Sequence, residues 1–192
     1  MYVLRGLCAV AARRQVPELW RRAGATPDAH ARQGDVRRPR AADVVLYGGL
    51  AAGILDILNA IVFWRLYSGT SATVILQSVA AGIQGKAAFA GGTQSAALGL
   101  FLHLSIVCAM AAIYWLACRR WPRMIEKPLQ AGVAYGLLTW AAMNYVVVPL
   151  SRASAPPFIA SWFADGLLAH VLLVGLLFAF VARRSALRPG GR

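Results

Sequence analysis

Long apolar stretches separated by short polar segments dominate the chain from residue 43 to residue 184. Four of these stretches reach the roughly 20 apolar residues that a helix needs to cross a bilayer. The pattern predicts membrane-spanning helices over residues 44–64, 96–118, 129–150 and 158–182, each bounded by Gly or Pro turn residues. The predicted fold class is therefore all-α, a bundle of four transmembrane helices.

The segment between the first two spans, residues 70–86, has a different pattern. Its apolar side chains recur at helical spacing, at Ile75, Leu76, Val79 and Ile83. Its polar side chains fall between them, at Gln77, Ser78, Gln84 and Lys86. We expect a short amphipathic helix that lies in the membrane interface or partly re-enters the bilayer. A plain loop is the alternative.

Charge is sparse in the spans and strongly basic outside them. The 192 residues are 59% hydrophobic and only 14% charged, yet the formal net charge is +13. Of the 20 Lys and Arg residues, nine precede the first span, four lie between the second and third, and four follow the fourth. The positive-inside rule makes this side cytoplasmic, with both termini on it.

The same clusters bear on partners and on domain organisation. Basic residues that alternate with apolar stretches predict contact with anionic lipids of the bilayer, and no nucleic-acid partner, which would need a basic face on a folded domain. We expect a flexible basic tail over residues 1–42, a four-span domain over residues 43–184 and a cytoplasmic tail over residues 185–192. A membrane-surface helix over Val3–Trp20 is an alternative for the first tail.

The second half of the chain resembles the first. Residues 49–56 match residues 132–139, and residues 99–103 match residues 166–170. The first and third spans run in the same direction, so the match predicts a parallel two-helix internal repeat. A coincidence among frequent Ala, Gly and Leu residues is the alternative.

Both odd-numbered spans carry a GxxxG motif. The glycines are Gly49 and Gly53 in the first span, and Gly132 and Gly136 in the third. Small residues let helix backbones approach closely in lipid. We expect these glycines to pack helices within one bundle, with pairing of two copies into a homo-oligomer as the alternative.

A few polar residues remain inside the predicted spans. A charged group at the centre of a bilayer costs about 2.5–3.5 kcal/mol on insertion scales, so such residues mark functional positions. The six are Asp56, Asn59, His103, Asn144, Asp165 and His170. All fall in the outer halves of the predicted spans, which predicts one polar layer that a proton or a small ligand can reach.

The chemistry of this layer stays open at the sequence level. His103 and His170 lie in spans that can face each other across a bundle, where they would suit a b-type haem or a metal ion. Histidine also titrates near neutral pH, which suits proton-coupled transport or sensing. A satisfied polar network that fixes helix register, in a structural or assembly subunit, is the third possibility. The sequence carries no HExxH, P-loop or nucleophile-elbow motif, so we do not expect an enzyme.

Three strings carry a resemblance to a known family: Val74–Gly82, Leu100–Trp121 with its central His103, and Met143–Ser151. From Asp43 to Arg184 the chain resembles small four-span, YagU-like proteins of the bacterial inner membrane. The resemblance implies an inner-membrane location. It implies no reaction.

Overall fold

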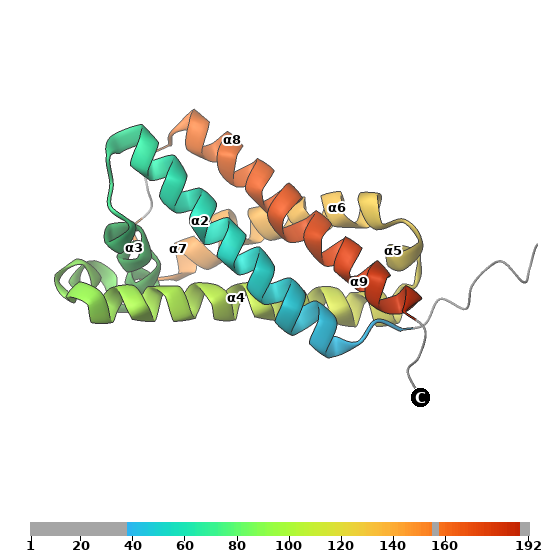
Figure 1. Cartoon of the computed structure of the whole chain (residues 1–192). Coiled ribbons are helices and arrows are strands. Elements are labelled where there is room, and N and C mark those ends of the chain that lie inside the picture. Colours follow the sequence, from blue (N-terminus) through green and yellow to red (C-terminus); the bar gives the residue numbers. More distant parts are fainter. Residues whose placement is uncertain (1–37, 155–157, 189–192) are drawn as a thin grey trace, which may run out of the picture. The chain divides into compact units, whose positions relative to one another are not determined.

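The computed structural model describes residues 38–154 and 158–188, and every regular element in these residues is a helix (Figure 1). Four helical stretches are long and apolar enough to cross a membrane: Asp43–Ser68, Gly92–Arg120, Pro128–Leu150 and Ala160–Leu187. The predicted all-α fold with four spans is confirmed, and the chain is a multi-pass membrane protein. The first 37 residues of the predicted tail lie outside the described part of the chain.

Only the second of the four spans is a single α-helix, α4 (Gly92–Arg120). The others contain π-helical segments, in which the turns are wider than in an α-helix. The first span joins η2 (Asp43–Gly48) to α2 (Gly49–Ser68). The third consists of α6 (Pro128–Ala142), η4 (Met143–Val147) and α7 (Val148–Leu150). The fourth consists of α8 (Ala160–Ala169), η5 (His170–Leu176) and α9 (Leu177–Leu187).

All four spans are longer than predicted, the third by one residue. The first continues through Arg65 to Ser68 and ends at Gly69, whose positive φ of 72° closes the helix. The fourth begins two residues later than predicted but continues to Leu187, so residues 185–187 of the predicted tail are helical. The helical hydrogen bonds continue past the last apolar residue, so hydrophobicity alone underestimates the length of each helix.

The segment between the first two spans is helical, so the loop alternative is wrong. Helix α3 (Ala72–Gln84) begins at Ser71, whose hydroxyl accepts a hydrogen bond from the Val74 amide, and a 3-10 helix, η3 (Gly85–Ala90), follows it. Helix α3 packs closely on α4, where Gly99 leaves room for the Leu76 carbonyl.

Polar contacts hold α3 on α4. The Gln77 amide is 4% exposed and donates to the Gly92 carbonyl at 3.0 Å, and Ser95 donates to the Gln84 side chain at 2.6 Å. Ile83 is 54% exposed. The buried face of α3 is therefore more polar than its hydrophobic spacing predicts.

Helix α2 lies between α4 and the fourth span. It packs against α4 on one side and against α8, η5 and α9 on the other, while α6 packs against η5 and α9 (Figure 1). The main core gathers around the rings of Tyr114, Tyr135 and Phe178.

One end of the bundle, here called the α5 end, brings together three basic segments. They are the start of the first span, the connection that holds α5 (Arg123–Glu126), and the end of α9. Ser185 donates to the Asp43 carboxylate at 2.7 Å, and Arg183 donates to the Glu126 carbonyl at 3.4 Å. Helix α3 lies at the opposite end, here called the α3 end (Figure 1).

Candidate functional site

The four GxxxG glycines all lie against a neighbouring helix of the same chain. A Cβ atom on Gly49 would lie 2.9 Å from Cys108 Sγ in α4, and one on Gly53 would lie 2.9 Å from Leu104 Cδ2. A Cβ atom on Gly132 would lie 2.8 Å from Leu176 Cδ2, and one on Gly136 would lie 2.5 Å from Val171 Cα, both in η5. The two motifs therefore each join an odd-numbered span to the span that follows it.

The polar residues of α2 lie beside these close contacts. Asp56 is midway between the ends of its span, because the helix continues to Ser68. The polar position is therefore nearer the middle of the span than the shorter predicted helix placed it. Asn59 follows one turn later. Both side chains are only partly exposed, and they reach different neighbouring helices.

Asp56 pairs with His103 of α4. The Asp56 Oδ2 atom lies 3.7 Å from His103 Nε2, and the two side chains are 17% and 14% exposed. The same Nε2 atom lies 3.0 Å from the Gly53 carbonyl oxygen. With a hydrogen on Nε2, the ring donates to the Gly53 carbonyl, and the Asp56 carboxylate lies 3.7 Å from the same nitrogen. This arrangement brings an acid and a base together in the apolar part of two spans.

Asn59 connects the first span to the fourth. Its Nδ2 atom donates to the Asp165 Oδ2 atom of α8 at 2.9 Å, in a partly buried contact. Each of the two α2 residues thus has a partner on a different helix, so the structure brings together four of the six predicted polar residues as two pairs.

The other two predicted residues bond within their own helices. His170 Nδ1 lies 2.9 Å from the Gly166 carbonyl, and Asn144 donates to the Trp140 carbonyl at 2.8 Å. Asn144 is exposed, and no residue of η4 is buried. The structure therefore places Asn144 on the outside of the bundle rather than in a shared layer.

The two imidazoles have separate surroundings, one beside α2 and one against its own helix. Each carbonyl contact uses one ring nitrogen, so Nδ1 of His103 and Nε2 of His170 are the nitrogens that could bind a haem iron or a metal ion. Within residues 38–154 and 158–188, no group of three or more His, Cys, Asp or Glu side chains lies close enough to hold a metal ion.

Two further polar contacts were not predicted from the sequence. The bond from Gln77 to Gly92 and the bond from Ser185 to Asp43 both join segments distant in the chain. The hydrophobic spacing of residues 70–86 placed Gln77 on a solvent-facing side. The signal that could have indicated burial of Gln77 is that the small residues Ala80 and Ala81 lie one turn after it on the helix, because small residues permit close helix contact.

Comparisons with protein-family models, with curated proteins and with solved structures found no match to this chain. The resemblance to YagU-like proteins stays a prediction.

Proposed function

We propose that this chain is a bacterial inner-membrane protein whose Asp56–His103 pair takes up and releases protons, in transport or in sensing. The observation that carries the proposal is the placement of that pair. A carboxylate and an imidazole lie 3.7 Å apart in the apolar part of two spans, with little exposure.

Two proton arrangements suit this geometry. With the proton on His103, the imidazolium faces the Asp56 carboxylate and the two charges compensate each other. With the proton on Asp56, both groups are neutral and the ring still has the Gly53 carbonyl at 3.0 Å. Both arrangements hold one proton between the two groups and carry no net charge, so uptake or release of a proton by the pair would pass through a state with one net charge, the condition that is costly for ionisable groups in a membrane.

The proposed orientation places the α5 end in the cytoplasm. Three segments rich in Arg and Lys meet at that end, and cytoplasmic segments of membrane proteins carry the excess of basic residues. On this orientation α3 lies on the outer side. Protons would reach Asp56 and Asn59 from the outer end of α2.

Equivalent contacts in the two halves support the proposed internal repeat. His103 bonds the carbonyl of Gly53, and Gly136, the match of Gly53, lies against the backbone of His170, the match of His103. The match of Asp56 is Thr139, whose hydroxyl bonds the carbonyls of its own helix. The acid is thus specific to the first half, and we assign the proton site to that half alone.

Infrared difference spectroscopy tests the proposal directly. The full chain is reconstituted in vesicles of phosphatidylethanolamine and phosphatidylglycerol, and spectra are recorded before and after a pH jump. We expect a carbonyl band of a protonated carboxyl group that changes with pH and is absent in Asp56→Asn. The control is Asp165→Asn, which removes a carboxylate bonded to Asn59 and should retain the Asp56 band.

A spectrum without any band that depends on Asp56 would contradict proton exchange. His103→Gln should alter the band, since it removes the proton partner. His170→Gln should leave the band unchanged, since His170 bonds its own helix at Gly166.

The second candidate function is structural, and the Asn59–Asp165 bond favours it. That bond and the Asp56–His103 pair join α2 to two different helices, as interhelical ties would. Polar bonds between membrane helices contribute about 0.6 kcal/mol on average. If the ties only fix helix register, Asp56→Asn and Asn59→Ala would both lower the unfolding free energy by amounts of this order, and no pH-dependent band would occur.

A further inference from the structure

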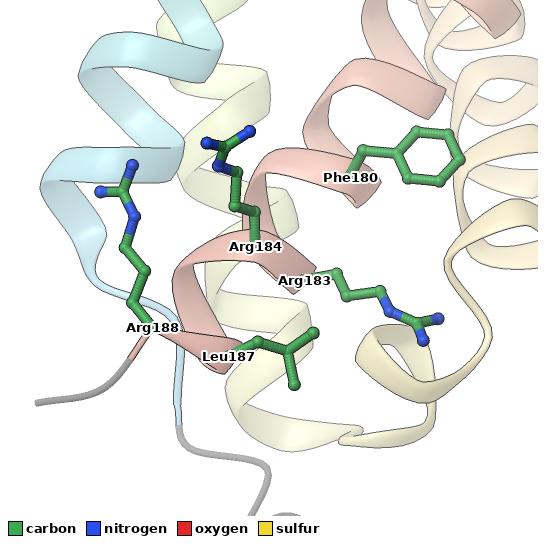
Figure 2. A pocket seen from close by; sticks show the side chains of 5 residues that line it. All are labelled: Phe180, Arg183, Arg184, Leu187 and Arg188. Carbon is green, nitrogen blue, oxygen red and sulfur yellow. The ribbon is translucent and has the colours of Figure 1, made fainter.

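The last two turns of α9 present one exposed face at the α5 end of the bundle. Figure 2 shows the side chains that line a shallow pocket of about 540 Å³ there: Phe180, Arg183, Arg184, Leu187 and Arg188. Their spacing of three and four residues places them on one side of the helix. Aromatic, aliphatic and cationic groups thus lie together on one open face of the helix.

The cationic groups of this pocket are only partly compensated. Arg188 lies 3.5 Å from the Asp43 carboxylate, and Arg183 donates to the Glu126 carbonyl. In the part of the chain that the structure describes, no carboxylate lies within ion-pair distance of Arg184. Arg188 directly follows the last residue of α9, four residues after Arg184, and like charges at this separation in the chain repel each other. An anion between them would relieve this repulsion.

The wider surroundings strengthen the attraction for anions. The described residues at the α5 end carry nine Arg and Lys side chains but only two acids, Asp43 and Glu126. A guanidinium group binds phosphate oxygens through two parallel hydrogen bonds, which favours phosphate among anions.

Apolar side chains distinguish this pocket from a site for soluble phosphate. Phe180 is 51% exposed and lies one turn before Arg184, toward the interior of the span, while Leu187 is 57% exposed. From Phe180 to Arg184 this face changes from apolar to cationic, as a phospholipid changes from acyl chain to headgroup, while Leu187 lies beyond Arg184 at the end of the helix.

We propose that this pocket binds one anionic phospholipid, with its headgroup phosphate between Arg184 and Arg188 and an acyl chain along Phe180. The site is independent of the Asp56–His103 pair, which lies in the apolar part of the first and second spans.

Native mass spectrometry of the full chain in detergent micelles tests the site. The protein is titrated with dioleoyl phosphatidylglycerol, and the apparent dissociation constant of the first bound lipid is measured. A basic side chain near an anionic headgroup contributes about fivefold in affinity. We expect Arg184→Gln to weaken binding by about fivefold, and Arg184→Gln with Arg188→Gln by about 25-fold.

The matched control is Arg120→Gln, which removes the same charge at the same end from α4. Arg120 lies over the Trp121 ring, 5.9 Å from its centroid, and outside the pocket. We expect a loss of less than about twofold for this variant. Equal losses in Arg184→Gln and Arg120→Gln would overturn the proposal in favour of diffuse attraction by the whole basic end.

Three further arms complete the test. Arg184→Lys, with helical content checked by circular dichroism, should bind more weakly than the parent but more tightly than Arg184→Gln, because it keeps the charge and loses the paired hydrogen bonds, and Phe180→Ala should weaken phosphatidylglycerol binding. Dioleoyl phosphatidylcholine, which has the same acyl chains but no net charge, should bind weakly. Displacement of phosphatidylglycerol by millimolar inorganic phosphate alone would overturn the lipid assignment and identify a soluble-anion site.

Discussion

At the scale of single residues, glycine sets how closely the helices approach. The third and fourth spans meet where Gly136 faces the backbone of Val171. The obstacle to a side chain there is backbone, which cannot rotate away as a flexible side chain can. In lipid, where apolar burial gives little driving force, this close contact carries much of the helix association.

Gly136→Ala should therefore destabilise the bundle. The new Cβ atom would lie 2.5 Å from Val171 Cα, and overpacking of this kind costs about 1–3 kcal/mol. The measurement is denaturant unfolding of the full chain in detergent micelles, followed by circular dichroism. Gly166→Ala is the control, because its Cβ atom would meet Trp140 Nε1 at 3.6 Å, an ordinary contact. Equal midpoints for the two variants would contradict the role of Gly136.

At the scale of elements, the position of α3 depends on close contact with α4 rather than on burial of its apolar side chains. Its buried side includes Gln77, and its closest approach to α4 is at Gly99, against the Leu76 carbonyl. The Arg152 amide also donates to the Gly82 carbonyl at 2.9 Å, which connects α3 to the segment after the third span.

Gly99→Val should displace α3 from α4, because the added side chain would occupy the place of the Leu76 carbonyl. The exposed Lys86, just after α3, then becomes a better trypsin site, and its cleavage rate in reconstituted vesicles should rise. Gly82→Ala is the control, since its Cβ atom would lie 3.8 Å from Ser151 Cβ. If cleavage at Lys86 is the same in both variants, α3 does not depend on the Gly99 contact.

The four spans and the helix after the first span could be predicted because each depends on local properties of the sequence. Apolar length defines a span, and the spacing of apolar residues defines a helix. The π-helical segments η2, η4 and η5 could not be predicted, since they depend on how each span packs against its neighbours.

The sequence identified polar residues of the candidate site, but not which helices they contact. The sequence places Asp56 and Asn59 one turn apart on α2, but it does not say that they reach different helices, His103 on α4 and Asp165 on α8. It also gave Asn144 the same weight as His103, because burial depends on the contacts of neighbouring spans. A polar residue within a span indicates a candidate site, but the packing of the helices decides which polar residues contact one another.

At the scale of the whole molecule, the fold collects the basic segments of the chain at one end of the bundle. The basic segments from three places in the sequence meet at the α5 end, where Arg183 bonds the connection of α5 and Ser185 bonds the start of the first span. A membrane protein with one strongly basic end has a defined direction of insertion.

Labelling with a membrane-impermeant maleimide checks this direction. In a background with Cys8, Cys108 and Cys118 replaced by alanine, Thr70→Cys should react in intact spheroplasts, since in the proposed orientation it follows the outer end of α2. Lys127→Cys should react only after the membrane is permeabilised. The opposite pattern would reverse the proposed orientation.

The π-helical segment η5 lets the fourth span tolerate a change of one residue in its length. A wide turn accommodates an additional residue, so in genetic terms η5 corresponds to an inserted codon that the helix has absorbed. Removing one residue from residues 170–176 would therefore leave a regular α-helix, with α8 and α9 close to their present orientation and Asp165 still beside Asn59. Removing one residue from within α8, which has no wide turn, would instead rotate the residues before it by about 100° relative to those after it. A one-codon deletion should thus be tolerated better in η5 than in α8.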